Sequence, residues 1–140
     1  MTMAGQPLAP DGAACPCGRL DARRKPLAYA QCCAPWHQGQ AAPDAEALMR
    51  SRYSAFVRGL APYLQATWHA STRPAELVLD PAVRWLGLEV RRHVVMDATH
   101  ADVEFVARSR QDGRGQRLHE LSHFVQEDGR WWYVDGVLKI

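Results

Sequence analysis

The sequence lacks any apolar run approaching the roughly 18 to 20 residues that a membrane span needs. Its first ten residues, Met1 to Pro10, contain neither a basic stretch nor a continuous apolar segment, so they do not have the pattern of a secretory signal peptide. Hydrophobic residues make up 47% and charged residues 23% of the 140-residue chain, which is typical of a globular protein with one ordinary core. We therefore expect a cytoplasmic protein with no membrane span.

A strong excess of charge of either sign is also missing. The 17 basic and 15 acidic side chains leave a net charge of +2, which gives little electrostatic support for nucleic-acid binding. Lysine is scarce, since the basic residues are 15 arginines and 2 lysines. Arginine favours planar or partly buried contacts, so either some of these side chains pair internally or at an interface, or the excess reflects a genomic preference.

Recognisable catalytic motifs are absent as well. The chain contains no G-x-S-x-G, Walker or Rossmann pattern. Four histidines have no acid or nucleophile at a recognisable catalytic spacing: His69, His93, His119 and His123. We assign no catalytic residue, and the sequence favours a binding protein over an enzyme.

Cysteine is absent outside residues 15–33, where the spacing is C-x-C-x14-C-C and the four residues are Cys15, Cys17, Cys32 and Cys33. Four clustered thiols suit one tetrahedral metal ion, because thiolate is a preferred zinc ligand and a complete set of four leaves no open position. In a reducing compartment such cysteines are more often ligands or redox groups than disulfides. The sequence favours a structural zinc site, with iron as an alternative occupant and a redox site or inert thiols as alternative interpretations. His37 is a candidate substitute for one cysteine.

The residues between the two cysteine pairs are polar. Pro16 and Gly18 bend the backbone so that the first pair can face one ion. Three consecutive cations follow, at Arg23, Arg24 and Lys25. We expect these cations either to stabilise nearby thiolates or to meet an acidic partner.

The cysteine segment resembles a known module. Cys-Pro-Cys-Gly at 15–18, followed by Tyr-Ala-x-Cys-Cys-x-Pro-x-His-x-Gly at 29–39, is similar to the SEC-C metal-binding motif, a zinc module found at the C-terminus of the SecA translocation ATPase. Segments 45–57, 67–74, 85–90 and 118–131 resemble the bacterial YchJ family. The resemblance implies a SEC-C zinc knuckle followed by a nuclear-transport-factor-2-like (NTF2-like) domain. One departure is the gap of 14 residues between the cysteine pairs, which is longer than the motif usually has.

From Asp44 the pattern is helical. Asp44 is a suitable N-cap, and Glu46 lies in the first turn, where the helix dipole favours an acid. Arg52 falls near the centre of the apolar stripe, so its cation must snorkel or meet an acid. Gly59 and Pro62 end this helix, and residues 63–69 fit a second short one. The stripe itself recurs every three or four positions: Ala45, Leu48, Met49, Tyr53, Phe56, Val57 and Leu60.

Further along the chain the hydrophobic period changes to two. Alternating segments at 86–95, 103–108, 118–125 and 131–137 are separated by turns rich in glycine and aspartate. Four antiparallel strands after a helical start predict an α+β fold, with helices covering one face of a curved sheet. The resemblance implies the same arrangement, an NTF2-like cone.

The NTF2-like resemblance implies a cone whose mouth can hold a small ligand. The candidate polar residues are Arg52 and Glu120, with Trp68, His69 and Trp132 as walls. Glu120 shares a strand face with Leu118 and Phe124, so it points towards Arg52 if that face is the inner one. The two side chains then form either a structural ion pair between helix and sheet or part of a ligand pocket.

These patterns predict a loose tail at 1–14, a SEC-C zinc knuckle at 15–40 and an NTF2-like domain at 41–140. The expected function is that of a zinc-binding adaptor, whose knuckle docks a protein or ribosomal partner in protein export or nascent-chain quality control. By resemblance the partners are the SecB chaperone or the ribosome. The alternative is a small-ligand binder or enzyme that uses the Arg52 and Glu120 pocket, and RNA binding by the knuckle is a weaker idea. Both a monomer and a homodimer remain compatible with the apolar run at 131–133.

Overall fold

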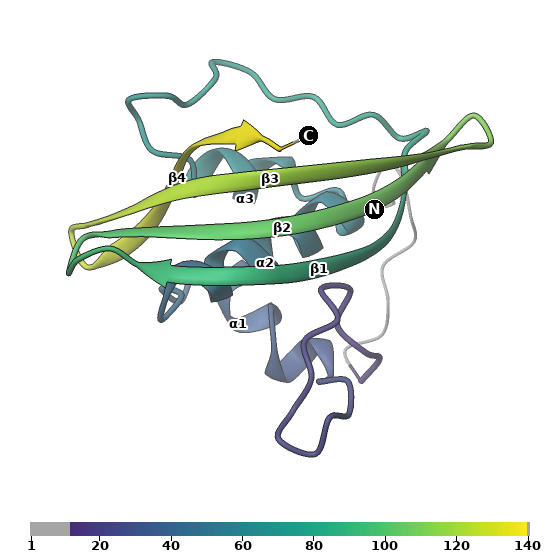
Figure 1. Cartoon of the computed structure of the whole chain (residues 1–140), viewed down its shortest axis with the longest axis horizontal. Coiled ribbons are helices and arrows are strands. Elements are labelled where there is room, and N and C mark those ends of the chain that lie inside the picture. The colour runs from purple at the N-terminus through teal and green to yellow at the C-terminus, as the bar shows by residue number, and fades with distance from the viewer. Residues whose placement is uncertain (1–11, 140) are drawn as a thin grey trace.

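The computed structural model describes residues 12–139, which form one curved antiparallel sheet with helices on one of its faces (Figure 1). Most of the predicted tail lies outside the described residues. The chain enters through the cysteine segment, where Ala14 forms an isolated antiparallel bridge with Ala28. A short 3-10 helix η1 (Tyr29–Gln31) and the four-residue helix α1 (Ala34–His37) complete this N-terminal segment.

Helix α2 (Ala45–Arg58) begins and ends where the sequence predicts. Asp44 Oδ1 accepts a hydrogen bond from the amide of Ala47 at 2.7 Å, which caps the N-terminus. At the other end Gly59 adopts φ of 74°, the left-handed conformation that lets glycine close a helix. The caps therefore define where this helix begins and ends.

Helix α3 (Ala61–Ala66) begins earlier than the predicted segment 63–69 and is shorter. Pro62 lies in its first turn, where a helix needs no amide donor, so this proline begins a helix rather than separating two. The predicted start and end of this helix were both wrong, because a proline shortly after a helix-ending glycine can either break a helix or begin the next one.

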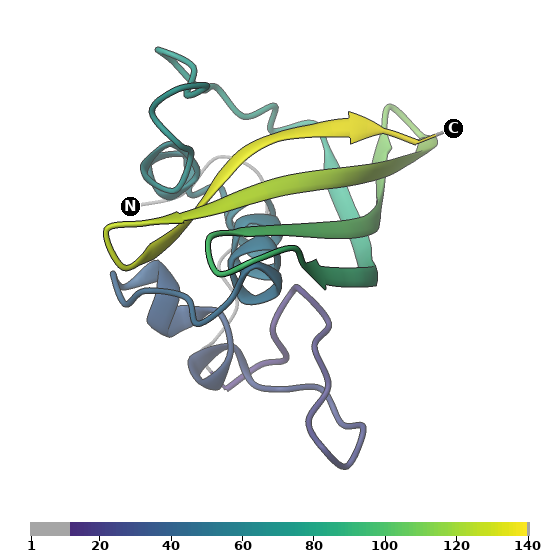
Figure 2. The ribbon, with the colours of Figure 1, turned by 60° about the vertical axis from the view of Figure 1, so that its left-hand side comes forward.

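The four predicted strands are all present and all antiparallel, in the order β1-β2-β3-β4. They are β1 (Arg84–Val95), β2 (His100–Gln111), β3 (Arg114–Glu127) and β4 (Arg130–Leu138). Register shifts interrupt β1 near Gly87 and Arg92 and the β3·β4 pair near Phe124. Such bulges bend strands, and the sheet curls around α2 (Figure 2).

The core lies between α2 and the inner face of the sheet. Val103, Phe105 and Phe124 are buried on that face, and Leu48 and Met49 meet them from the helix. The same cluster of buried side chains continues into the four cysteines, so the N-terminal segment and the sheet share one hydrophobic core. The cysteine segment is thus packed on α2 rather than tethered beside it.

Candidate functional site

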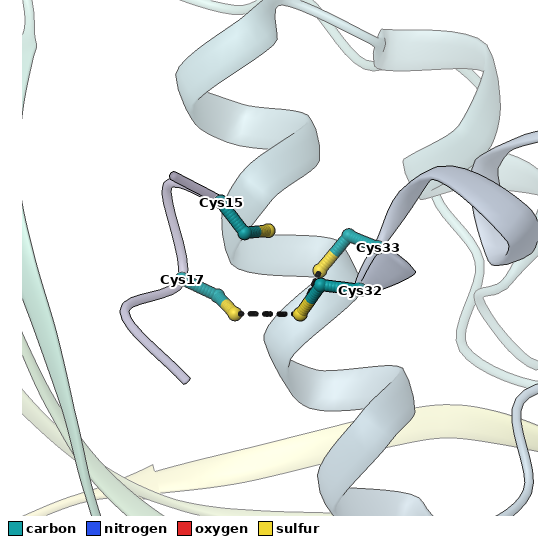
Figure 3. A group of neighbouring side chains, drawn as sticks. All are labelled: Cys15, Cys17, Cys32 and Cys33. Atoms are coloured by element: carbon teal, nitrogen blue, oxygen red, sulfur yellow. Dashed lines mark hydrogen bonds between the residues drawn. The ribbon is translucent and has the colours of Figure 1, made fainter. Parts of the chain in front are cut away.

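A short backbone pairing positions the first two cysteines. The amide of Cys15 donates to the carbonyl of Leu27 at 2.8 Å, which holds the incoming chain against the segment that carries the second pair. The chain then turns at Gly18, whose amide donates to Cys15 O at 3.1 Å and whose φ of 75° suits glycine. As a result Cys15 and Cys17 face the second pair at the start of α1 (Figure 3).

The long gap between the cysteine pairs forms a compact loop that leaves the cluster intact. Asp21 Oδ1 accepts hydrogen bonds from the amides of Arg23 at 2.8 Å and Lys25 at 3.0 Å, which tightens the tip. Arg23, Arg24 and Lys25 are exposed there. The additional residues therefore project three cations away from the sulfur atoms.

The four sulfur atoms have the spacing of a metal-ligand set. All four lie within 4.8 Å of one another, with Cys17 and Cys32 Sγ 3.6 Å apart and Cys32 and Cys33 Sγ 4.0 Å apart. Sulfurs placed tetrahedrally about 2.3 Å from a central ion are about 3.8 Å apart. Every one of these cysteines is free and buried. Within residues 12–139 no other group of three or more cysteine, histidine or carboxylate side chains is gathered closely enough to hold one ion.

The thiols also affect one another electrostatically. Hydrogen bonding with Cys17, and then with the other two thiols, holds the pKa of Cys15 far below its usual range. Contacts with Cys15 and Cys17, together with burial, raise the pKa of Cys33 far above it. A thiolate that has already formed therefore makes deprotonation of the remaining thiols less favourable. A bound dication would remove this opposition, since a metal deprotonates the thiols that coordinate it.

Helix α2 supplies polar contacts beneath the cluster. Ser54 Oγ donates to Cys33 Sγ at 3.3 Å and lies 3.5 Å from Cys15 Sγ. Arg50 Nη1 donates to the carbonyl of Cys17 at 3.1 Å, while its Nε donates to Glu46 at 2.8 Å. These groups hold the ligand segment in place and offer hydrogen-bond donation to a thiolate, as outer contacts of metal sites do.

His37 lies beside the cluster and is engaged elsewhere. Its Nδ1 is 2.6 Å from the Tyr29 hydroxyl, and its Nε2 is 2.8 Å from the carbonyl of Ser51. Burial lowers the pKa of this imidazole, which favours its neutral form. In this conformation the half-buried side chain of His37 links α1 to α2 through its contact with Ser51. Both ring nitrogens contact groups other than the cysteine sulfurs, and the role of His37 as a substitute ligand stays a prediction.

Arg52 is buried in the core, as its place in the apolar stripe predicts. Its Nη1 donates to Leu64 O and to Thr67 Oγ1, both at 2.7 Å, and its guanidinium lies 4.5 Å from the ring centroid of Tyr133. Burial lowers the pKa of Arg52 to about 10, so the side chain remains a cation at neutral pH. Carbonyl, hydroxyl and aromatic groups thus surround this charge, in place of the acid or the solvent that the sequence offered as alternatives.

Glu120 points to the inner side of the sheet, as predicted. Its Oε2 accepts hydrogen bonds from Ser122 at 2.6 Å and from the Tyr133 hydroxyl at 3.4 Å. Among the described residues no ion pair within 4.0 Å joins Glu120 to Arg52, so the predicted direct pair is absent. The carboxylate instead packs over Gly136, where an added Cβ would collide with it. Tyr133 lies between the two charges.

Arg52 and Glu120 both line a cavity between α2 and the sheet, and Trp68 is part of its wall. His69 and Trp132, the other predicted wall residues, lie outside that lining. His69 Nε2 is 3.0 Å from Glu127, and the indole of Trp132 donates to the carbonyl of the same Glu127 at 3.1 Å. His69 lies in the segment after α3, and Trp132 is next to the inward-facing Tyr133 on β4, so the alternation of the strand turns its side chain to the opposite face.

Two histidine contacts were not predicted from the sequence. His119 Nε2 lies 2.7 Å from Glu104, and His123 Nδ1 lies 2.8 Å from Asp102, both between β2 and β3. Such partners depend on strand register, which sequence spacing does not reveal. These pairs lie on the helix-free face of the sheet, away from the cavity.

The fold and the cysteine cluster together define an NTF2-like domain that carries an N-terminal four-cysteine module. A family model described as "YchJ, middle NTF2-like domain" matches residues 44–136. A UPF0225 protein from Polaromonas sp. (strain JS666 / ATCC BAA-500) is 64% identical over 129 residues, which cover 89% of this chain and 93% of that protein. The chain belongs to the YchJ family, as its sequence motifs indicate.

Two solved structures extend the comparison to the cysteine module. A SEC-C motif containing protein from Psychrobacter arcticus has a TM-score of 0.75 and 33% identity, covering 93% of this chain and 85% of that one. RPA3114 from Rhodopseudomonas palustris, also titled a SEC-C motif containing protein, has a TM-score of 0.75 and 30% identity, covering 91% and 100%. Both support a cluster compatible with metal binding. Among residues 12–139, every helix is too short or too polar to span a lipid bilayer.

Proposed function

We propose that this protein is a metal-binding adaptor in which Cys15, Cys17, Cys32 and Cys33 hold one structural zinc ion. The observation that carries the proposal is the packing of four buried sulfurs within 4.8 Å of one another. Four thiolates leave no open position on zinc, so the ion stabilises the segment and takes no part in catalysis. Iron fits a tetrahedral sulfur site as well and is the alternative occupant.

The knuckle, residues 15–40, is the docking module of this proposal, and residues 41–140 are its carrier. Support comes from the exposed tip at Arg23, Arg24 and Lys25, which the metal-bound segment would present away from the sheet. Three adjacent cations on a tightened turn fit an acidic surface on the partner, which by resemblance is the ribosome or SecB. The proposal places the protein in the cytoplasm, where four free thiols stay reduced.

Ribosome binding gives a direct test of the docking role. Purified metal-loaded protein should sediment with ribosomes, and reversal of the tip charges in R23E/R24E/K25E should weaken that binding at least about tenfold at low salt. A matched variant with the same charge change on the sheet, R84E/R108E/R117E, should bind as the unmodified protein does. The same pair of variants is then tested on purified SecB. If the tip variant binds as tightly as the sheet variant, docking through the tip is refuted. It is also refuted if the unmodified protein binds neither ribosomes nor SecB.

A further inference from the structure

The cavity between α2 and the sheet has a volume of about 150 Å³. Its walls are mostly aromatic and aliphatic, with Tyr53 and Phe56 from the helix and Trp85 and Phe105 from the strands. Leu118, which is 36% exposed, lies in the lining next to solvent. An apolar cavity of this size in another protein binds benzene, so the space suits one aromatic ring.

Arg52 brings unused hydrogen-bond donors to this apolar space. A guanidinium has five N–H donors, and Nη1 uses its two on Leu64 O and Thr67 Oγ1. Across the described residues no acceptor engages Nε or Nη2. The rings of Trp68 and Tyr133, with centroids 5.1 Å and 4.5 Å from the guanidinium carbon, hold the group in place. A ligand with an oxygen acceptor would complete its hydrogen bonding.

Glu120 brings an unused acceptor to the same space. Ser122 and Tyr133 both donate to Oε2, which leaves Oε1 without a donor among residues 12–139. The absence of a side chain at Gly136 leaves room for the carboxylate in this position. If the two charges served only to join helix to sheet, direct contact would be the favourable geometry, but here Tyr133 contacts both charges and lies between them.

From this arrangement we propose that the cavity binds an uncharged, single-ring aromatic molecule carrying one group that both accepts and donates hydrogen bonds, such as a phenol or an aromatic amide. The ring would fill the apolar space, its oxygen would accept from Arg52, and its O–H or N–H would donate to Glu120. One cation and one anion already balance in the cavity. A neutral ligand preserves that balance, whereas an anion would leave an unpaired negative charge.

Titration with phenol, benzamide, toluene and benzoate, followed by the amide and indole NMR signals of the metal-loaded protein, tests the proposal. Phenol and benzamide should shift the indole signals of Trp68 and Trp85 saturably. They should bind at least about tenfold more tightly than toluene, which makes no hydrogen bonds, and than benzoate, which is charged. Comparable affinity for toluene, or no saturable shift below about 10 mM phenol, would overturn the proposal.

Two variants separate specific binding from a general stability effect. Leu118→Trp should obstruct the cavity and abolish the phenol shifts, while Leu86→Trp, at an exposed leucine of β1 outside the lining, should leave them unchanged. Glu120→Gln should strengthen benzoate binding at least about tenfold, because the cavity then carries an unbalanced positive charge. A Glu120→Gln protein that folds and still rejects benzoate would contradict the charge argument. Phenol shifts that persist in Leu118→Trp would place the site elsewhere.

Discussion

Replacing Cys17 with serine is expected to abolish stoichiometric metal binding and to release residues 15–40 from α2 while the four-stranded sheet persists. Cys17 is fully buried, and its Sγ lies 3.6 Å from that of Cys32, so a serine hydroxyl would replace a thiolate at the centre of the set. Hydroxyl oxygen is a poor zinc ligand, and three remaining thiolates hold the ion less firmly. Metal binding is coupled to folding of its own segment, so that segment should lose its order.

Hydrogen exchange with metal analysis measures this effect region by region. In Cys17→Ser the amides of Cys15 and Leu27 should exchange far faster, whereas those of β2 and β3 should keep most of their protection. The melting temperature should fall too, because the cysteines share a core with Leu48 and Met49. Ala30→Ser, at an exposed position of the same segment, is the matched control and should change neither property. Uniform loss of protection across the sheet would contradict the two-part organisation that we propose.

Replacing Arg52 with alanine is expected to lower the free energy of unfolding by about 2–4 kcal/mol. Leu64 O is a carbonyl in the last turn of α3, and a charged donor satisfies it at 2.7 Å. Without Arg52 this buried acceptor loses that donor, the Tyr133 ring loses its cation, and the cavity grows. Each change destabilises the folded state, and the variant's freedom from the cost of desolvating the buried arginine offsets only part of the loss.

The matched variant Arg52→Met keeps an unbranched side chain of similar length and removes the charge. Methionine also leaves Leu64 O without its charged donor but fills most of the space that alanine leaves empty, so this variant should lose about 1–2 kcal/mol, less than Arg52→Ala. Urea denaturation of the two variants under identical metal loading measures both values. If Arg52→Met is destabilised as strongly as Arg52→Ala, the lost charge and hydrogen bonds, and not the lost side-chain volume, dominate the effect.

The helix and strand elements could be predicted because each follows from local chemistry. Asp44 and Gly59 cap α2 through their own backbone and side-chain preferences, and alternating apolar residues mark the strands. The start of α3 could not be predicted as securely, since Pro62 is compatible with ending one helix or beginning the next. The bulges near Gly87 and Phe124 depend on pairing across strands, for which sequence spacing gives no signal.

In the two candidate sites, too, local features could be predicted and contacts that depend on strand pairing could not. The cysteine cluster was predictable because all four thiols lie within 19 residues, and one reversal of the chain between the two pairs brings them together. Periodicity also placed Arg52 and Glu120 on facing surfaces, yet it gave the angle of each side chain and not the distance between them. Tyr133 and Gly136, which separate and accommodate the two charges, enter through the β3·β4 register.

Elemental analysis of freshly purified protein, paired with thiol titration, tests the central claim most directly. Zinc held by all four cysteines predicts about one equivalent of zinc per chain, with thiols that react only after chelation. In Cys32→Ser the metal should be lost and the remaining thiols should become reactive. Less than about half an equivalent of zinc or iron in the unmodified protein, together with four freely reactive thiols, would contradict the account.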